Sequence, residues 1–599
     1  MKTRVSDYIF SAIAKAGTRH VFVVSGGGAM YLNDALALNQ SLKYINNFHE
    51  QASVMAADTY SRVTGNLGVA LVTSGPGGTN AVTAVLSAWQ DSIPLLVISG
   101  QSKRKETVYN SNLKNLRQFG FLEANIIPIV ESITKFSAFV DEPEKIRYFL
   151  EKAMYMARSG RPGPVWLDIP LDVQGSEIET DKLAGYKSPE EKTSQLQVKN
   201  QIAKVVNMLK GSKKPVIIAG SGIRHAAAND DFIKLLAVLK VPVVTSIMGV
   251  DVIADNHPSF VGRVGLRGER SANFAVNNAD LVISIGARLG VAVIGYEYEK
   301  FAPLARKIIV DIDEVEHRKP TIKPDLIINL DAKIFIKELD RTIRGKKLEF
   351  KRDWLLKLSR LHIKYPVYQK EYSKLKGRMN VYHVIFKITE SLKNDDVVVT
   401  DAGTPYYVAR QVIKIKKGQR LLMPGATGVM GFNLPGAIGA SLGRGNRRVI
   451  CITGDGSLQF NISELQTISH YKLPIKLFIL NNIGYMSIRN TQSRFFGGRL
   501  MGESPNSDVT FPKISSLART YKIKYTKAKN NRQLDRVISK VLSFKGPVIC
   551  ELMCLPNQEL IPAVSSKRLS DGTLVSTGID EMYPFLTSRE MARIKEDLS

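Results

Sequence analysis

The residues best suited to chemistry follow two apolar segments in the last third of the chain. Gly454-Asp455-Gly456 comes directly after the apolar run 448–453, and Asn481-Asn482 closes a second apolar run, 475–480. A helix-length segment separates the runs, so we expect two parallel strands whose carboxyl ends lie side by side. Asp455 and Asn482, 27 positions apart, would then meet at one point.

Their side chains predict a particular kind of ligand. A carboxylate oxygen, an amide oxygen and a nearby free main-chain carbonyl suit a hard divalent cation whose other ligands are phosphate oxygens. Gly456 and Ser457, at the start of the next helix, offer backbone N–H groups to the same phosphates. A lone Gly-Asp-Gly is usually a turn, but this pairing with Asn-Asn predicts a site for a metal and a diphosphate.

Composition narrows the class of protein. The chain has 599 residues, 44% of them hydrophobic and 23% charged, which is typical of a soluble globular protein of about three or four domains. No stretch approaches the ~20 apolar residues of a membrane span. Three cysteines without metal-ligand spacing favour a reducing cytoplasm. The net charge of +28 is spread along the chain, without the aromatic-interleaved patch typical of nucleic-acid binding. It fits a solvated lysine-rich surface, an anionic substrate or a membrane surface.

Three segments alternate apolar strands with amphipathic helices, which predicts an α/β fold of three parallel-sheet, Rossmann-like domains. We place these domains at 1–175, 196–340 and 376–555, with a tail at 556–599. A polar stretch, 176–200, is interpreted as a linker, and a basic, helix-prone connection spans 340–378. A glycine-rich stretch, 489–504, is interpreted as a mobile loop or an ordinary surface loop. The tail combines loop signals with a short terminal helix.

The metal motif resembles that of thiamine-diphosphate enzymes, and the first segment resembles the pyrimidine-binding domain of their acetolactate synthase group. The matching residues there are 47–52, the turn 73–80 and Asp91-Ser-Ile-Pro94. The resemblance implies that Mg²⁺ is held by Asp455, Asn482 and the main-chain oxygen of Gly484. It also implies that Glu50 hydrogen-bonds the pyrimidine N1′, so that the 4′-nitrogen can act as a general base on the thiazolium carbon C2.

The turn 424–432 resembles the family's Gly-x-Met-Gly-Phe turn. By that match the carbonyl of Gly428 accepts from the cofactor's 4′-amino group, and Met430 is the apolar wedge that bends the cofactor. Asp401-Ala-Gly403-Thr404 is the expected second diphosphate loop, although Thr404-Pro405 replaces the family's Gln-His. Gly27 is expected to face the reacting centre and Phe121 to line the substrate pocket. The remaining expected contacts are Gly75, Asn80, Gly403, Thr404, Gly454, Gly456, Ser457, Tyr485 and Met486.

Several strand ends of the middle segment match positions that contact FAD in flavin-containing acetolactate synthases. An Asp at a strand end suits a ribose hydroxyl, and arginines suit a diphosphate. Two interpretations stay open: a structural FAD, or a Rossmann-like domain with an empty or ADP-type pocket, because the family's Arg-Phe-Asp-Asp-Arg run is reduced to Arg288-Leu-Gly-Val-Ala. The residues expected to contact FAD are Arg161, Gly222, Met248, Gly249, Arg267, Gly286, Arg288, Asp311, Ile312 and Glu316.

The resemblance implies a carboligase that decarboxylates a 2-oxo acid, such as pyruvate, and joins the two-carbon unit to a second carbonyl. Leu122, Leu171 and Thr491 replace a Gln, a Lys and a Trp of the family's pocket, so the acceptor stays open between a 2-oxo acid and a bulkier ketosugar. The alternatives are a simple 2-oxo acid decarboxylase or carbon–carbon hydrolase, and a basic nucleic-acid-binding protein on a reused scaffold. In the family the site forms between two subunits, which implies a homodimer or homotetramer.

Overall fold

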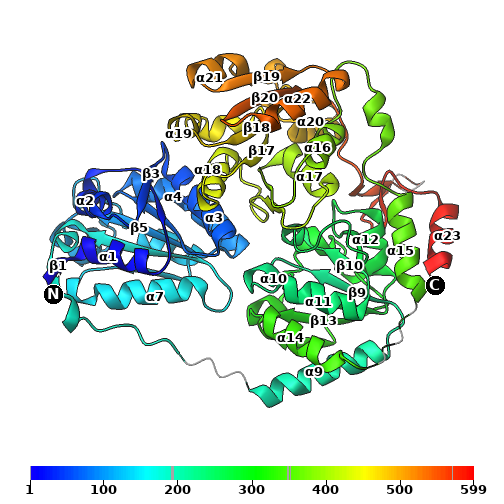
Figure 1. Cartoon of the computed structure of the whole chain (residues 1–599), viewed down its shortest axis with the longest axis horizontal. Helices are drawn as coiled ribbons and strands as arrows, with labels where there is room; N and C mark the ends of the chain where they lie inside the picture. Colours follow the sequence, from blue (N-terminus) through cyan, green and yellow to red (C-terminus); the bar gives the residue numbers. More distant parts are fainter. Residues whose placement is uncertain are drawn as a thin grey trace. The chain divides into compact units, whose positions relative to one another are not determined.

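The computed structural model describes residues 2–189, 194–346, 348, 350, 352–568, 571 and 573–598. It contains three six-stranded sheets joined by helices (Figure 1), which confirms the predicted α/β fold class. The chain divides into two compact units. The first comprises Met1–Glu190, Asp396–Tyr406 and Leu422–Pro556, and the second Glu191–Asp395, Tyr407–Leu421 and Asn557–Ser599. The domain boundaries expected above stay predictions.

The first sheet has the strand order β3-β2-β4-β5-β7-β6 and is parallel throughout. Its central strands are fully buried, as expected for a sheet covered on both faces. The helices α1 (Val5–Lys15), α2 (Met30–Leu38), α3 (Glu50–Thr64), α4 (Pro76–Asp91) and α7 (Ile146–Arg158) connect or flank the strands. The strands are β2 (His20–Val23), β3 (Lys43–Asn46), β4 (Gly68–Val72), β5 (Leu95–Gln101), β6 (Phe136–Phe139) and β7 (Pro164–Pro170).

The third sheet has the order β16-β15-β17-β18-β20-β19. The two apolar runs that begin and end the metal motif are its central strands β17 and β18, which pair in parallel. The strands are β15 (Val397–Thr400), β16 (Arg420–Leu422), β17 (Val449–Gly454), β18 (Ile475–Asn481), β19 (Lys524–Ala528) and β20 (Val548–Met553). The helices are α17 (Gly403–Val412), α18 (Asn433–Gly443), α19 (Glu464–His470), α20 (Met486–Phe495), α21 (Ile514–Thr520) and α22 (Asn531–Ser543).

One continuous core joins the first and third sheets within the first unit. Helices α3 and α18 pack closely along their length, and Gly439 makes this approach feasible, because a Cβ there would lie 1.9 Å from the carbonyl oxygen of Ala56. The two sheets therefore support each other's helices, and residues on one sheet can fix loops of the other.

The central sheet of the second unit has the order β11-β10-β9-β12-β13-β14 and is parallel. Side chains of β9 alternate between two cores: Ile217 packs with α9 (Gln195–Lys210), α11 (Asn229–Leu239) and α14 (Ala332–Ile343), whereas Ile218 packs with α12 (Arg270–Asn277) and α15 (Arg352–Lys364). The strands are β9 (Pro215–Ala219), β10 (Val243–Thr245), β11 (Phe260–Arg263), β12 (Leu281–Ile285), β13 (Arg306–Asp311) and β14 (Leu326–Asn329).

Two segments outside the three large sheets contain more regular structure than the sequence analysis expected. Within the linker 176–200, β8 (Glu177–Glu179) pairs antiparallel with β1 (Lys2–Arg4), while 190–193 lie outside the described residues. The stretch 489–504 is not one loop, because its first seven residues complete α20. The tail ends in the expected helix, α23 (Ser588–Leu598), although Ser570 and Gly572 of its loop signal lie outside the described residues.

Candidate active site

The carboxyl ends of β17 and β18 bring Asp455 and Asn482 together, as the sequence predicts. The two strands pair with Gly454 opposite Leu480, so the residues that follow them lie at the same edge of the sheet. Both side chains are buried, at 3% exposed each. Asp455 accepts hydrogen bonds from the backbone N–H groups of Gly456 (3.0 Å) and Gly484 (3.2 Å), which fix the carboxylate without neutralising its charge.

Three polar atoms converge at this edge. The inward atom of the Asn482 amide lies 3.2 Å from Asp455 Oδ1 and 2.8 Å from the carbonyl oxygen of Gly484. With its nitrogen inward, the amide donates to both oxygens. With its oxygen inward, it completes a set of three oxygen ligands, and separations of about 3 Å are those between adjacent ligands of an octahedral ion bound at about 2.1 Å. The donor set therefore fits Mg²⁺.

The electrostatic environment of Asp455 favours a cation as well. Burial raises the pKa of its carboxyl to about 6, against the backbone N–H groups that lower it. Among the described residues no group of three or more His, Cys, Asp and Glu side chains could hold a metal ion. The arrangement at Asp455 contains one carboxylate only, so it needs phosphate or water oxygens to complete a coordination shell.

An ion pair that the sequence analysis missed supports the Asn482–Gly484 turn. The Arg489 guanidinium is buried, pairs with Glu503 and donates to the carbonyl oxygens of Asn482 (3.4 Å) and Ile483 (2.7 Å). Gly484 has φ +121°, and a Cβ there would lie 1.9 Å from the carbonyl oxygen of Glu503, so only glycine fits. The sequence analysis could not identify this pair, because Arg489 and Glu503 lie in a stretch that looks like a polar loop and their spacing is not that of a known motif.

A second network places the predicted diphosphate residues beside the Met430 turn. Asp401, fully buried after β15, accepts from Ser457 and from Asn433 (2.5 Å), and Ser457 Oγ accepts from the N–H of Gly431 (3.1 Å). Burial raises the pKa of Asp401 to about 6. Met430 is half-buried, and Gly428 has φ +58° with open space where a Cβ would point.

The other predicted third-sheet residues lie around these two networks. Gly403 begins α17 with φ +70°, and Thr404 next to it is buried. Gly456 packs against the ring of Tyr485, because a Cβ there would lie 2.3 Å from that ring. Gly454 ends β17, and Met486 begins α20 with its side chain buried. All of them lie at or near the strand edge that carries Asp455.

Glu50 begins α3 and is 9% exposed. Its Oε2 accepts from Asn80 Nδ2 at 3.0 Å, and Asn80 lies in the first turns of α4. Gly77 approaches the other oxygen, since a Cβ there would lie 3.7 Å from Glu50 Oε1. The structure thus brings Glu50 and the predicted Asn80 together, and leaves the carboxylate at a helix N-terminus, where negative charge is favoured.

The remaining first-sheet residues lie on loops at the ends of the strands. Gly75 precedes α4 with φ +59°, and its missing side chain leaves room for the carbonyl of Leu122. Gly27 has open space where a Cβ would point. Phe121 is 86% exposed, which is unusual for an aromatic side chain and leaves it available to substrate or to another chain.

The central sheet has the topology of a nucleotide-binding fold. Its strand order reverses between β9 and β12, and ligands of such sheets bind at the carboxyl ends at that point. The glycines there have a second explanation, however. A Cβ on Gly222 would lie 2.6 Å from the Cα of Gly286, and one on Gly249 would lie 2.3 Å from the carbonyl oxygen of Ala219. At these positions a side chain would collide with the protein's own backbone, so packing alone explains why they are glycines.

Only some of the side chains predicted to contact FAD lie at the strand ends of the central sheet, whereas others contact other groups of the protein. Arg288 is exposed after β12, and Met248 is half-buried after β10. Asp311 ends β13, which lies two strands from β9, and Ile312 follows it. Arg267 donates to the carbonyl of Leu560 and stacks on Tyr407, and Glu316 pairs with Lys319. Arg161 belongs to the other unit and donates to Ser92 Oγ at 2.8 Å. The side chains at this edge do not single out a flavin.

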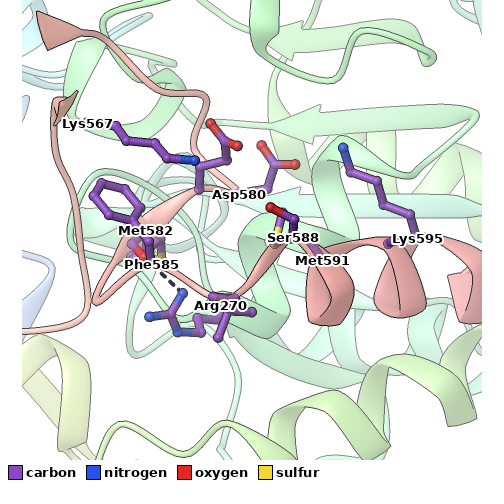
Figure 2. Close-up of a pocket in the computed structure, with 11 residues that line it drawn as sticks. Arg270, Lys567, Asp580, Met582, Phe585, Ser588, Met591 and Lys595 are labelled. Carbon is purple, nitrogen blue, oxygen red and sulfur yellow. Dashed lines mark hydrogen bonds between the residues drawn. The ribbon is translucent and has the colours of Figure 1, made fainter. Parts of the chain in front are cut away.

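A separate pocket of about 300 Å³ lies in the second unit (Figure 2). It is lined by α12, the tail and α23, with Lys567 and Lys595 among its cations and Asp580 among its carboxylates. No predicted site residue lines it, so we place the candidate active site at the strand edges of the first unit. In the part of the chain that the structure describes, no helix combines the length and apolar character needed to cross a bilayer.

Comparison with known proteins agrees with this placement. Family models match three parts of the chain: the N-terminal TPP binding domain of thiamine pyrophosphate enzymes at residues 3–121, their central domain at 202–339 and their C-terminal TPP binding domain at 401–552. TPP is thiamine diphosphate, also called thiamine pyrophosphate. The central sheet lies wholly within the middle match, whereas β6, β7 and β15 lie outside the matches to the other two domains.

Whole-chain relatives point to one group of these enzymes. The acetolactate synthase large subunit of Cyanidium caldarium is 32% identical over 569 residues, which cover 93% of this chain and 94% of that protein. The probable acetolactate synthase large subunit of Methanocaldococcus jannaschii is 31% identical over 582 residues, 94% of each chain. The acetolactate synthase large subunit of Lactococcus lactis subsp. lactis is 30% identical over 572 residues, 95% of this chain and 96% of that protein. These findings confirm the prediction of a thiamine-diphosphate-dependent carboligase, and the chain belongs to the thiamine-diphosphate enzyme family, in its acetolactate synthase large-subunit group.

Proposed function

We propose that this enzyme uses Mg²⁺ and thiamine diphosphate to decarboxylate pyruvate and to transfer the two-carbon unit to a second carbonyl compound. The convergence of the Asn482 amide with Asp455 Oδ1 and the Gly484 carbonyl carries the proposal, because this donor set needs a hard cation that also binds phosphate. Bound thiamine diphosphate supplies a nucleophilic carbon that releases CO₂ from a 2-oxo acid.

Each protein residue has a distinct task in this proposal. Asp455, Asn482 and the Gly484 carbonyl would hold the cation, and the N–H group of Ser457 would bind the diphosphate, because the N–H of Gly456 already donates to Asp455. Glu50 would hold a proton at the pyrimidine nitrogen, and Met430 would pack against the cofactor as an apolar support. Gly27 leaves room for the 2-oxo acid, and Phe121 covers it against water.

The identity of the acceptor is tested by product analysis. Purified protein is supplied with Mg²⁺, thiamine diphosphate and labelled pyruvate, with and without ketosugars, and the labelled carbon skeletons are identified. A new carbon–carbon bond supports the carboligase, whereas free acetaldehyde as the sole product would favour a simple decarboxylase. Glu50→Ala is the control, and we expect it to lose at least about 100-fold in turnover.

Thr491 bears on acceptor size. It lies on α20 with an exposed side chain, where relatives of the acetolactate synthase group are expected to carry a tryptophan. We expect Thr491→Trp to shift the preference from bulky acceptors toward a second 2-oxo acid, because the indole fills the space near the acceptor. The ratio of products formed in competition between the two acceptors measures the shift.

We further propose that the site forms between two chains, in a homodimer or homotetramer. Co-expression of Glu50→Ala with Asp455→Asn tests this directly. If each site combines Glu50 of one chain with Asp455 of the other, half of the dimers are mixed and one of their two sites is intact, so about a quarter of wild-type activity returns. Sites within one chain would give no recovery.

For the central sheet we propose a structural FAD at the reversal between β9 and β12. The topology and the exposed Arg288 support a nucleotide there, and none of the residues with a task in the proposed reaction belongs to this sheet. The two visible absorption bands of oxidised flavin in the purified protein would support it. A colourless protein that retains carboligase activity would indicate that no flavin is bound, and that the domain has an empty or ADP-type pocket. The cytoplasmic location expected from the cysteines stays a prediction.

A further inference from the structure

The first unit has a first-sheet half (Met1–Glu190) and a third-sheet half (Asp396–Tyr406 and Leu422–Pro556). The turn 424–432, which carries Met430, belongs to the third-sheet half and is fixed by side chains of the first-sheet half. Asp91, the last residue of α4, is fully buried, and its two carboxylate oxygens accept from the backbone N–H groups of Gly425 and Ala426, each at 2.9 Å. Ser87 Oγ of the same helix lies 3.0 Å from Thr427 Oγ1. The first-sheet half thereby holds three consecutive residues that lead into Gly428 and Met430.

A buried arginine completes this contact. The Arg62 guanidinium donates to Asp91 Oδ2 at 2.9 Å, to Asp58 Oδ1 at 2.6 Å and to the carbonyl oxygen of Met423 at 3.1 Å. The side chains of Arg62 and Asp58 are only 6% and 2% exposed. Three charges are thus enclosed where solvent cannot replace a missing partner, so the geometry of the segment 423–426 depends on all of them.

The mirror arrangement exists at the segment that leads into Glu50. Glu464, on α19 of the third-sheet half, is 0% exposed. Its Oε2 accepts from Asn47 Nδ2 and its Oε1 from the backbone N–H of Phe48, both at 2.7 Å. Thr467 Oγ1 donates to the same carboxylate at 2.7 Å. The third-sheet half therefore fixes the two residues that lie two and three positions before Glu50.

We propose that Asp91 and Glu464 are reciprocal positioning residues: each half of the first unit uses one buried carboxylate to orient the cofactor-contacting segment of the other half. Neither carboxylate touches the cofactor or the reacting atoms in the proposed function, on which this inference rests. Asp91 acts through the Met430 turn and Glu464 through the start of α3.

Hydrogen exchange of the cofactor-free protein tests the physical part of the proposal. In Asp91→Asn we expect the amides of Gly425 and Ala426 to exchange at least about tenfold faster, while the amide of Phe48 is unchanged. In Glu464→Gln we expect the reverse pattern. Asp168→Asn is the matched control, because Asp168 is equally buried in the first sheet but accepts from Ser99 and Gln101 instead of either turn.

The functional part needs a readout that mere destabilisation would not change. We expect both variants to lower kcat by about tenfold or more, with little change in the KM for pyruvate, and to reduce the near-ultraviolet circular dichroism of the bound cofactor, which depends on its bent geometry. Asp168→Asn should change neither. If Asp91→Asn does not fold, Ser87→Ala removes a contact to the same turn, and we expect a shift of about two- to threefold in the same readouts.

The outcomes separate this inference from the proposed function. Exchange that is unchanged at both segments overturns the positioning role. Faster exchange with normal kcat and normal dichroism also overturns it, because the carboxylates then serve only folding. A wild-type protein that takes up no thiamine diphosphate removes the proposed function, and the inference falls with it. If both variants show the expected pattern and Asp168→Asn does not, the result supports the positioning role and the proposed function.

Discussion

Asp455 and Asp251 are buried carboxylates near strand ends of two different sheets, and they differ in what neutralises them. Asp251 is 8% exposed and is joined by Arg224 at 3.0 Å and Arg420 at 2.8 Å. Burial acts to raise the pKa of Asp251, but the charges of the two arginines outweigh it and lower that pKa. Asp455 receives backbone N–H groups and faces the uncharged Asn482 amide, and burial raises its pKa to about 6.

The difference shows how to distinguish a structural carboxylate from one that awaits a ligand. Burying a carboxylate without a counter-charge is unfavourable, so a chain that does so at a strand edge keeps it for a purpose. The chain satisfies Asp251 from within, with two arginines of the second unit. At Asp455 the missing positive charge must come from outside, which fits a bound metal ion.

The largest effect expected from this comparison is that of Asp455→Asn on catalysis. Loss of the only charged ligand should lower turnover by about 1000-fold, equivalent to about 4 kcal/mol, because the cation no longer holds the diphosphate. The thermal midpoint of the cofactor-free variant should equal or exceed that of wild type, since an unpaired buried carboxylate has been removed. Turnover and differential scanning fluorimetry, with and without Mg²⁺ and thiamine diphosphate, measure both. A variant with normal turnover would refute the proposed metal site.

Asp251→Asn should have the opposite profile. Two arginines lose their buried partner, which we expect to destabilise the protein by about 3 kcal/mol and to lower its thermal midpoint. Specific activity of the folded fraction at low temperature should stay near that of wild type, because Asp251 has no task in the proposed reaction. A large loss of specific activity without a loss of stability would show that the comparison is mistaken.

The sequence predicted the parts of this picture that depend on local pattern. Apolar runs placed β17 and β18, and the type and spacing of Asp455 and Asn482 identified their common edge. It could not predict the roles of Arg489, Glu464 or Asp91, although Asp91 stands in a stretch that matches the family, because each acts through backbone groups or partners far along the chain and no spacing records such contacts. It treated 489–504 as a loop, although packing of Arg489 against Glu503 allows α20 to continue to Phe495. The flavin signal was ambiguous for a physical reason, since glycines at strand ends serve backbone packing and ligand approach equally.

Asp168 is another buried carboxylate without a counter-charge, and its titration lets the comparison be tested by pH. Burial raises the pKa of Asp168 to about 7, against hydrogen bonds from Ser99 and Gln101 that lower it. Because the folded-state pKa lies above the unfolded value, the stabilisation is complete below the unfolded pKa and is lost as pH rises through about 7. Relative to Asp168→Asn, wild type should lose about 2 kcal/mol between about pH 5.5 and about pH 7.5.

Thermal midpoints of wild type and Asp168→Asn, measured side by side across that pH range, give the loss of stability. The two curves should converge toward low pH and separate as pH rises, with the variant gaining relative stability. Curves that stay parallel would mean that Asp168 is already ionised in the folded protein at the lower pH. Its hydrogen bonds would then neutralise it as the arginines neutralise Asp251.

The smallest effect is expected where solvent itself takes the place of the counter-charge. Arg318 pairs with Glu314 at 2.7 Å, but the two side chains are 69% and 68% exposed. Water hydrates either charge after its partner is removed, so Arg318→Ala should change stability by only about 0.3 kcal/mol, and raised salt should abolish even that difference. A change comparable to that of Asp251→Asn, measured in the same thermal assay, would mean that pairing and not burial sets the energy of these carboxylates. The contrast between Asp455 and Asp251 would then lose its basis, because it requires that a carboxylate depends on a partner only where water cannot reach it.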